Sequence, residues 1–431
     1  MTAAKVYDVI GAGIGPFNLG LAALLDPVAD VKSLFFEQRP SFEWHPGMLL
    51  EGTVLNSTFL ADLVTFADPT SNYTLLHYLH KKNRLYQFYF YEDLHIPRRE
   101  YNEYAKWVAA QLSSCHFGYR VENVTERDEC YAVFIRNIET GEVSTYFARH
   151  VVVGTGSIPM FPPPIEKKID ENIYHSSSYV MRKGELKDTD NITVVGSGQS
   201  AAEIFYDLLQ DQKHYKYRLS WLTRSPEFFQ SEAAKLAREV FSPDYVSYFR
   251  TLDFETRLQA LPDLDKSRKG IEQSTLMKIY ELLYHRSIER VDPNVILQPM
   301  TEVTDIEQSP AGYKLFCRQW QKNEEFVHHS DKVIFATGYK PNVPDWLNAF
   351  GDKIEWEDQK RFKVDDAYRL VFKDNRSHHL YMLTNLDHSH GTAATNLALS
   401  VMRNQTIIND ICAREVYPLA ADTIFQRFYR K

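Results

Sequence analysis

Residues 6–25 read VYDVIGAGIGPFNLGLAALL, and their pattern is the first indication of the fold class. A short apolar run leads into a turn that contains Gly11, Gly13 and Gly15, and apolar residues at helical spacing follow. Strand, glycine turn and helix in this order are typical of a dinucleotide-binding βαβ unit, in which the turn amides and the helix N-terminus face a pyrophosphate. Pro16 stands where the usual fingerprint has its third glycine.

The next apolar run, residues 33–36, ends in Glu37. In a dinucleotide-binding unit, an acid at the end of the second strand accepts hydrogen bonds from the adenosine ribose hydroxyls. An ordinary glycine turn is the alternative interpretation of residues 11–16. The strand before the turn and the acid after it favour the nucleotide site.

The same pattern occurs a second time along the chain. ITVV at 192–195 leads into GSGQSAAE at 196–203, in which Ala201 is the permitted small third residue. The strand that follows ends in Arg224 rather than in an acid. A basic residue at this place suits a 2′-phosphate, so the second unit is predicted to bind NADPH. A solvated surface arginine is the alternative for Arg224.

Two such units in one chain predict an α/β fold with two Rossmann-like domains, the first for FAD and the second for NADPH. The strings VVVGTGSIP at 151–159 and KVIFATGY at 332–339 are strands that end in glycine turns, where the chain would pass between the domains. The expected ranges are 1–160 and 335–431 for the FAD domain, and 165–230 and 290–334 for the NADPH domain.

The segment between them, residues 231–290, is rich in helix signals and is predicted to form a small helical substrate subdomain. Within it, Leu276, Ile279, Tyr280, Leu283 and Tyr284 recur at helical spacing. This spacing predicts that the five side chains pack in a core.

The composition excludes several classes of protein. The chain has 431 residues, 44% of them hydrophobic, and a net charge of −8, which is the balance of a soluble multidomain protein without nucleic-acid partners. Its four cysteines form neither a CxxC pair nor a metal-ligand spacing, so we expect no metal, no disulfide-reductase chemistry and a reducing cytoplasm. No signal peptide is recognised, and no run reaches the roughly 18 apolar residues that span a bilayer.

The chain resembles the flavin-dependent N-hydroxylating monooxygenases of siderophore biosynthesis, the lysine, ornithine and diamine N-hydroxylases. The matching strings extend over almost the whole chain: GAGIGPFN (11–18), FEWHPGM (42–48), TFLADLVTFADP (58–69), IPRREY (96–101) followed by Trp107, GSGQSAAE (196–203), ATGY (336–339) and HG (390–391). The string WHPGM and Pro16 are the most specific of these matches.

The resemblance implies that NADPH reduces FAD, that O2 then forms a C4a-hydroperoxyflavin, and that a neutral primary amine attacks it to give a hydroxylamine. No protein nucleophile is required. The pocket must favour the neutral amine, because a free alkylamine with a pKa near 10 is protonated at pH 7. The resemblance also implies a homotetramer. Ketone or sulfide oxidation by the same peroxide, and a noncatalytic dinucleotide-binding redox sensor, are the other hypotheses.

The resemblance also implies roles for individual residues. FAD would contact Gly11, Gly13, Gly15, Pro16, Glu37, Trp44, His45, Asn56, Thr395, Asn396 and Leu397, and NADPH would contact Gly196, Gly198, Gln199, Ser200, Ala201, Arg224, Gln273 and Ser274. Asn56 and Gln273 are candidate supporting amides, and Asn56 stands where the amino-acid hydroxylases carry a glutamine. His45 has an alternative as a stacked structural histidine.

The substrate positions depart from the family pattern. Ala61 stands where the lysine and ornithine enzymes carry a lysine that pairs with the substrate carboxylate, and Ala398 replaces a serine. Arg238 falls where the ornithine enzymes place an asparagine. We therefore expect an amine without a carboxylate, such as putrescine, cadaverine or histamine, whose distal cation faces Glu239 or Asp244, although both acids also suit a helix surface. The alternative is an ornithine or lysine N-hydroxylase in which Arg238 holds the carboxylate.

Overall fold

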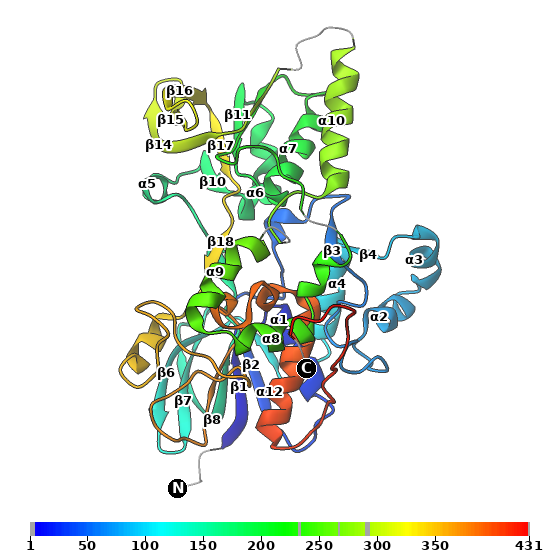
Figure 1. Cartoon of the computed structure of the whole chain (residues 1–431), viewed down its shortest axis with the longest axis vertical. Coiled ribbons are helices and arrows are strands. Elements are labelled where there is room, and N and C mark those ends of the chain that lie inside the picture. The colour runs from blue at the N-terminus through cyan, green and yellow to red at the C-terminus, as the bar shows by residue number, and fades with distance from the viewer. Residues whose placement is uncertain (1–4, 232–233, 266–267, 289–293, 430–431) are drawn as a thin grey trace.

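The computed structural model describes residues 5–231, 234–265, 268–288 and 294–429. The predicted boundaries at residues 1, 290 and 431 lie outside these ranges. Figure 1 shows one sheet at the lower end of the molecule and a second sheet at the upper end, with helices α8 and α9 between them. The α/β fold with two dinucleotide-binding-like sheets is confirmed.

The first sheet is built from both ends of the chain. Its order is β5-β2-β1-β8-β7-β6, and β19 pairs with β8. The strands are β1 (Val6–Ala12), β2 (Ser33–Glu37), β5 (Cys115–Phe117), β6 (Tyr119–Arg127), β7 (Cys130–Asn137), β8 (Val143–Val153) and β19 (Leu380–Met382). β1, β2, β5, β8 and β19 pair in parallel, whereas β6, β7 and β8 form an antiparallel meander.

Helix α1 (Pro16–Leu25) packs against α4 (Arg98–Ala109) and α12 (Leu397–Cys412). All residues of α1 except Phe17 are buried, because the stretch after the glycine turn is apolar on nearly every side. A helix that is apolar all round belongs in a core, and α1 lies in the largest hydrophobic cluster of the molecule.

The second sheet is fully parallel, with the order β10-β17-β11-β12-β13. Its strands are β10 (Ile173–His175), β11 (Asn191–Val195), β12 (Arg218–Leu222), β13 (Val295–Gln298) and β17 (Lys332–Phe335). Helices α7 (Gln199–Asp211) and α10 (Gln273–Ser287) pack against each other beside this sheet. The strands β14 (Thr301–Ser309), β15 (Gly312–Gln319) and β16 (Glu324–Ser330) form a separate antiparallel sheet.

The chain passes between the two sheets twice, and the two passages pair with each other. They form the antiparallel strands β9 (Ser157–Pro159) and β18 (Tyr339–Pro341). A second junction lies between η1 (Pro46–Met48) and η2 (Ser176–Ser178). A Cβ atom at Gly47 would lie 1.9 Å from the carbonyl oxygen of Ser177, so this close approach requires glycine.

The segment after β12 is helical, as expected, but its helices are divided between the two halves of the molecule. It contains η4 (Ala237–Val240), α8 (Pro243–Thr251) and α9 (Phe254–Leu264), and both α8 and α9 contact α11 (Asp387–His390). By contrast, α10 packs on α7. The prediction of a core stripe on α10 is wrong for Tyr280 and Tyr284, which are 72% and 59% exposed, because α10 covers the sheet with one side only.

The remaining elements are short connections. They are β3 (Val54–Thr58), β4 (His95–Pro97), α2 (Leu75–Lys81), α3 (Leu85–Tyr91), α5 (Pro163–Glu166), α6 (Tyr179–Arg182), η3 (Lys183–Leu186), η6 (Asp345–Phe350) and η7 (Thr392–Thr395). Among the described residues, no helix combines the length and apolar character needed to cross a membrane. Within the same ranges, no group of three His, Cys, Asp or Glu side chains could hold a metal ion.

Candidate active site

The first glycine turn leaves open space at the N-terminus of α1. Gly15 precedes the helix, and no side chain among the described residues caps it. A Cβ atom at Gly15 would have no described atom within 4 Å, so the helix amides adjoin open space, and such helix N-termini favour the binding of phosphate groups. Gly13 has a φ of 85°, and a Cβ there would lie 2.6 Å from the carbonyl oxygen of Gly154. Pro16 lies at the first helical position, where a backbone N–H would have no partner within the helix, so its missing N–H removes no hydrogen bond.

Two side chains hold this turn in place. Glu37, at the end of β2, accepts hydrogen bonds from the backbone amides of Ile14 and Arg39, both at 3.0 Å. A carboxylate has acceptor sites beyond these two, so Glu37 remains able to bind ribose hydroxyls. Asn18 is fully buried and donates to the carbonyl oxygen of Gly13 at 2.8 Å. The sequence reasoning missed Asn18, although it is part of the GAGIGPFN string.

The second glycine turn has the same form. Gly198 precedes α7, no described side chain caps the helix, and a Cβ at Gly198 would again meet open space within 4 Å among the described atoms. A Cβ at Gly196 would lie 2.3 Å from the carbonyl oxygen of Ala336. Gln199 donates to Thr275 Oγ1 at 3.1 Å and accepts from the backbone amide of Glu272 at 2.8 Å. These bonds fix the start of α10 beside the start of α7.

The structure therefore brings the predicted NADPH contacts to one end of the second sheet. Ser200 and Ala201 lie in the first turn of α7, and Gln273 and Ser274 lie in the first turn of α10. Arg224 follows β12, with an exposed side chain. The carboxyl ends of parallel strands meet at one sheet edge, which is where nucleotides bind in such folds.

The WHPGM string lies at the junction of the two sheets. His45 has a φ of 47° and stacks edge-on against Trp44, with ring centroids 5.0 Å apart. Its other neighbour is Tyr339, at 5.3 Å, and Tyr339 in turn contacts His175 at 5.0 Å. These edge-on ring contacts suit the structural role that the sequence left open for His45, and its contact with FAD stays a prediction.

We expect the protein to lose stability as the pH falls below 6.5. Burial lowers the pKa of His45 and of His175 to about 4, from an ordinary 6.5, and for His45 the positive charge of Arg98 adds to the effect. Below pH 6.5 the unfolded chain therefore binds protons that the folded chain does not. The stability contribution is complete above pH 6.5 and declines by about 1.4 kcal/mol per pH unit for each histidine as the pH falls toward 4.

Urea unfolding at pH 7, 6 and 5 measures this decline. His175→Asn should make the pH dependence shallower, whereas the same substitution at the exposed His80 should leave it unchanged. An equal slope in the wild type and in the His175 variant would contradict the expectation.

Two family strings meet in a buried ion pair that the sequence did not predict. Arg98 Nη1 lies 2.7 Å from Glu203 Oε2, and Arg98 Nη2 lies 2.9 Å from Glu203 Oε1. Arg98 begins α4, and Glu203 lies on α7, so the pair joins helices of the two sheets. The Glu203 side chain is 5% exposed, and this burial raises its pKa while Arg98 opposes the rise.

Two of the candidate substrate residues, Ala61 and Arg238, lie beside β3. Ala61 is 3% exposed and lies in the turn that follows β3. Arg238 Nη2 donates to the carbonyl oxygen of Asn56 at 3.1 Å and lies 3.4 Å from its Oδ1. The carboxylates of Glu239 and Asp244 are instead bonded to backbone amides near the C-terminus. These bonds do not test contact with a substrate, so contact of Glu239 or Asp244 with a substrate cation stays a prediction.

The residues predicted to close over FAD, Thr395, Asn396 and Leu397, lie at the junction of η7 and α12. Asn396 caps this helix through a 2.9 Å bond from the backbone amide of Ala398, and Leu397 is its first residue. Thr395 Oγ1 accepts from Arg268 Nη1 at 3.2 Å. Arg268 Nη1 also lies 3.0 Å from Asp387, so one guanidinium fastens α11 and η7.

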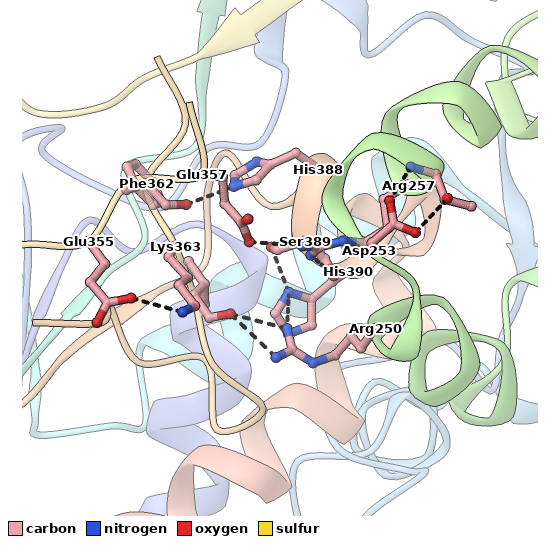
Figure 2. Close-up of polar contacts among 12 residues, drawn as sticks. Arg250, Asp253, Arg257, Glu355, Glu357, Phe362, Lys363, His388, Ser389 and His390 are labelled. Carbon is pink, nitrogen blue, oxygen red and sulfur yellow. Dashed lines mark hydrogen bonds and ion pairs between the residues drawn. The ribbon is translucent and has the colours of Figure 1, made fainter. Parts of the chain in front are cut away.

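Two further arginines fasten the same region, and the sequence reasoning missed them. In Figure 2, Arg250 from α8 points toward His390, and their Nη1 and Nε2 atoms lie 3.0 Å apart. Arg257 from α9 lies 2.8 Å from Glu357. Arg257 Nη1 also lies 3.5 Å from the carbonyl oxygen of Ser389 in α11. Because α11 leads through η7 to Thr395, the contacts of Arg250 and Arg257 hold the segment that is predicted to close over FAD against α8 and α9.

Comparisons with known proteins agree with this geometry. Residues 5–341 match the family model described as L-lysine 6-monooxygenase/L-ornithine 5-monooxygenase. The chain is 39% identical to the putrescine N-hydroxylase of Shewanella oneidensis, over 98% of this chain and 84% of the relative. It is 37% identical to the putrescine N-hydroxylase of Acinetobacter baumannii, over 99% and 95%. The FAD-bound cadaverine monooxygenase of the desferrioxamine pathway from Erwinia amylovora superposes with a TM-score of 0.93, at 36% identity and 99% coverage of both chains.

Proposed function

The chain belongs to the L-lysine 6-monooxygenase/L-ornithine 5-monooxygenase family, and from this membership we propose that it N-hydroxylates a primary amine without a carboxylate for siderophore biosynthesis. It is an FAD- and NADPH-dependent monooxygenase. The observation that carries the choice of substrate is Ala61, whose buried methyl group cannot pair with a carboxylate. Relatives named for putrescine and cadaverine support the same class of substrate.

We propose that residues 1–160 and 335–431 hold FAD, and that residues 165–230 and 290–334 hold NADPH. Two uncapped helix N-termini, each beside open space at Gly15 and at Gly198 among the described residues, support this division. Arg224 would bind the 2′-phosphate of NADPH. FAD, when bound, supplies the activation of O2, which no amino-acid side chain provides.

The protein would position the amine and keep it neutral. A primary alkylamine has a pKa near 10, so its neutral form must be favoured before it can act as a nucleophile. The guanidinium of Arg238 lies against Asn56, and a positive charge there disfavours a second one on the reacting nitrogen. Because Asn56 Oδ1 lies 3.4 Å from Arg238 Nη2, the NH2 group of the Asn56 amide would orient that nitrogen. Helices α8 and α9, which contact α11, would limit the entry of water.

A panel of five amines tests this function. Purified protein with NADPH and O2 should form hydroxylamine from putrescine and cadaverine with kcat/KM about 100-fold above that for ornithine and lysine, because a carboxylate without a partner is costly to desolvate. Histamine completes the panel. The product must be measured directly, since NADPH loss also reports peroxide leakage. Preference for ornithine or lysine would establish the alternative, with Arg238 as the carboxylate partner.

We further propose a cytoplasmic location and a homotetramer. The four cysteines are free thiols, which suits a reducing compartment. The exposed aromatic residues Tyr86, Tyr89 and Phe90 on α3, and Tyr280 on α10, offer apolar area for contacts between subunits. Sedimentation of the purified protein measures the assembly.

A further inference from the structure

The C-terminal strap, residues 419–429, is held by two carboxylates of the helical segment. After α12 the chain turns back at Ala413, and Phe428 of the strap lies against α8, close to the label C in Figure 1. Asp244 accepts from the backbone amides of Asp422 and Thr423, both at 3.0 Å. Glu239 accepts from the backbone amides of Phe425 and Gln426, at 3.2 and 3.0 Å.

Aromatic and side-chain contacts complete this attachment. The ring of Phe428 lies 4.8 Å from Tyr245 and 5.7 Å from Tyr248, measured between centroids. The side-chain amide of Gln426 donates to the carbonyl oxygen of Leu236. The strap has no regular secondary structure in its described part, and Phe425 is 94% exposed. Its position therefore depends on these side-chain contacts rather than on burial.

The strap holds the turn that carries Arg238. None of the η4 residues, all of which are described, is buried, so packing into a core does not fix this turn. Glu239, the neighbour of Arg238, is the point at which the strap is attached. Arg238 reaches across to Asn56 from the same turn.

We propose that the C-terminal strap positions Arg238 against Asn56 and so shapes the amine site. Glu239 and Asp244 are then positioning residues rather than contacts for the distal cation of a diamine. The effect on amine binding rests on the proposed function, whereas the attachment of the strap to η4 does not. Release of the strap allows Arg238 to leave Asn56, and the amine then binds a less ordered site.

The test releases the strap in the full-length chain with the double variant Glu239→Ala/Asp244→Ala. We expect KM for putrescine to rise about tenfold, with KM for NADPH and FAD content unchanged. Glu239→Gln/Asp244→Asn keeps one acceptor oxygen at each position and should recover part of the loss. Asp253→Ala is the matched control, because Asp253 also accepts two hydrogen bonds, but from the backbone amide and the hydroxyl of Thr256 at the start of α9 instead of from the strap.

A double-mutant cycle with Arg238→Ala distinguishes an effect of the strap through Arg238 from a general loss of structure in the amine site. If the strap acts through Arg238, its release adds nothing to KM in the Arg238→Ala background. Additive effects, or an equal rise in KM for NADPH, would overturn the proposal.

Hydrogen exchange decides the structural part without turnover. Release of the strap should speed amide exchange in residues 236–246 of the substrate-free protein and leave β11 unchanged. Unchanged exchange in residues 236–246 would overturn the proposal. If no amine in the panel yields hydroxylamine, the proposed function fails, and the exchange result still decides the role of the strap.

Discussion

Arg98→Ala is expected to lower the free energy of unfolding by about 3–5 kcal/mol, the largest stability loss that we predict for one substitution. The variant leaves the carboxylate of Glu203 without its charged partner in a site where the side chain is 5% exposed. An unpaired buried charge is far more costly than a missing pair. Because Arg98 and Glu203 belong to helices of different sheets, the contact between the two halves weakens as well. Urea unfolding at pH 7 measures the loss.

Three comparisons make this result specific. Arg99→Ala removes an exposed neighbouring arginine that bonds to one carbonyl oxygen, so it should cost less than about 1 kcal/mol. Arg98→Met/Glu203→Leu removes both charges and should recover most of the stability. In Arg98→Ala the pKa of Glu203 rises further, so its unfavourable charge develops as the pH increases, and the deficit should be larger at pH 7 than at pH 5. A similar loss from Arg99→Ala would contradict the ion-pair explanation.

Ala61→Lys should lower kcat/KM for putrescine by about 100-fold, the largest loss of activity that we expect. The introduced ammonium would repel the distal nitrogen of the diamine, which stays protonated while the reacting nitrogen is neutral. Two unit charges about 6 Å apart interact by about 2.8 kcal/mol at an effective dielectric constant of about 20, and this energy corresponds to about 100-fold. The same ammonium would pair with the carboxylate of ornithine or lysine, so the preference should move toward these amino acids. The amine panel measures both changes.

Ala61→Met is the matched control for size. It adds an unbranched side chain without a charge at a position that is 3% exposed. If methionine and lysine lower putrescine turnover equally while FAD content stays the same, the loss comes from crowding. In that case Ala61 does not determine the charge preference of the site.

The local parts of the site could be predicted because they follow short-range rules. Both glycine turns and the acid at Glu37 lie within single βαβ units, where the spacing along the chain sets the spacing in space. The ion pair of Arg98 with Glu203 joins residues that no periodic pattern relates. Asn18 was not predicted for a different reason. It stabilises the turn by donating to the carbonyl oxygen of Gly13, and the glycine spacing alone had already identified that turn.

The roles of surface side chains were harder to predict from the sequence than the positions of buried ones. Ile279 is buried and Tyr280 is exposed, although both belong to the apolar stripe that helical spacing predicts. The spacing does not show how much of such a stripe is covered by the neighbouring elements. The acid Glu239 could be assigned to substrate or to solvent from sequence, but its bonds go to a segment almost 190 positions later in the chain. The hydrogen bonds of Glu239 depend on the path of the C-terminal strap over the folded core, and no local sequence pattern gives that path.

The paired passages β9 and β18 give the protein a modular construction. Pro159 and Tyr339 are direct partners in this separate two-stranded ribbon, so the chain enters and leaves the inserted unit at one place. Antiparallel partners are close enough to be joined by a two-residue hairpin. Replacing the inserted unit by a tight turn would therefore leave the path of the first-sheet strands unchanged, but it would remove α8, α9 and Glu203, which contact the first half.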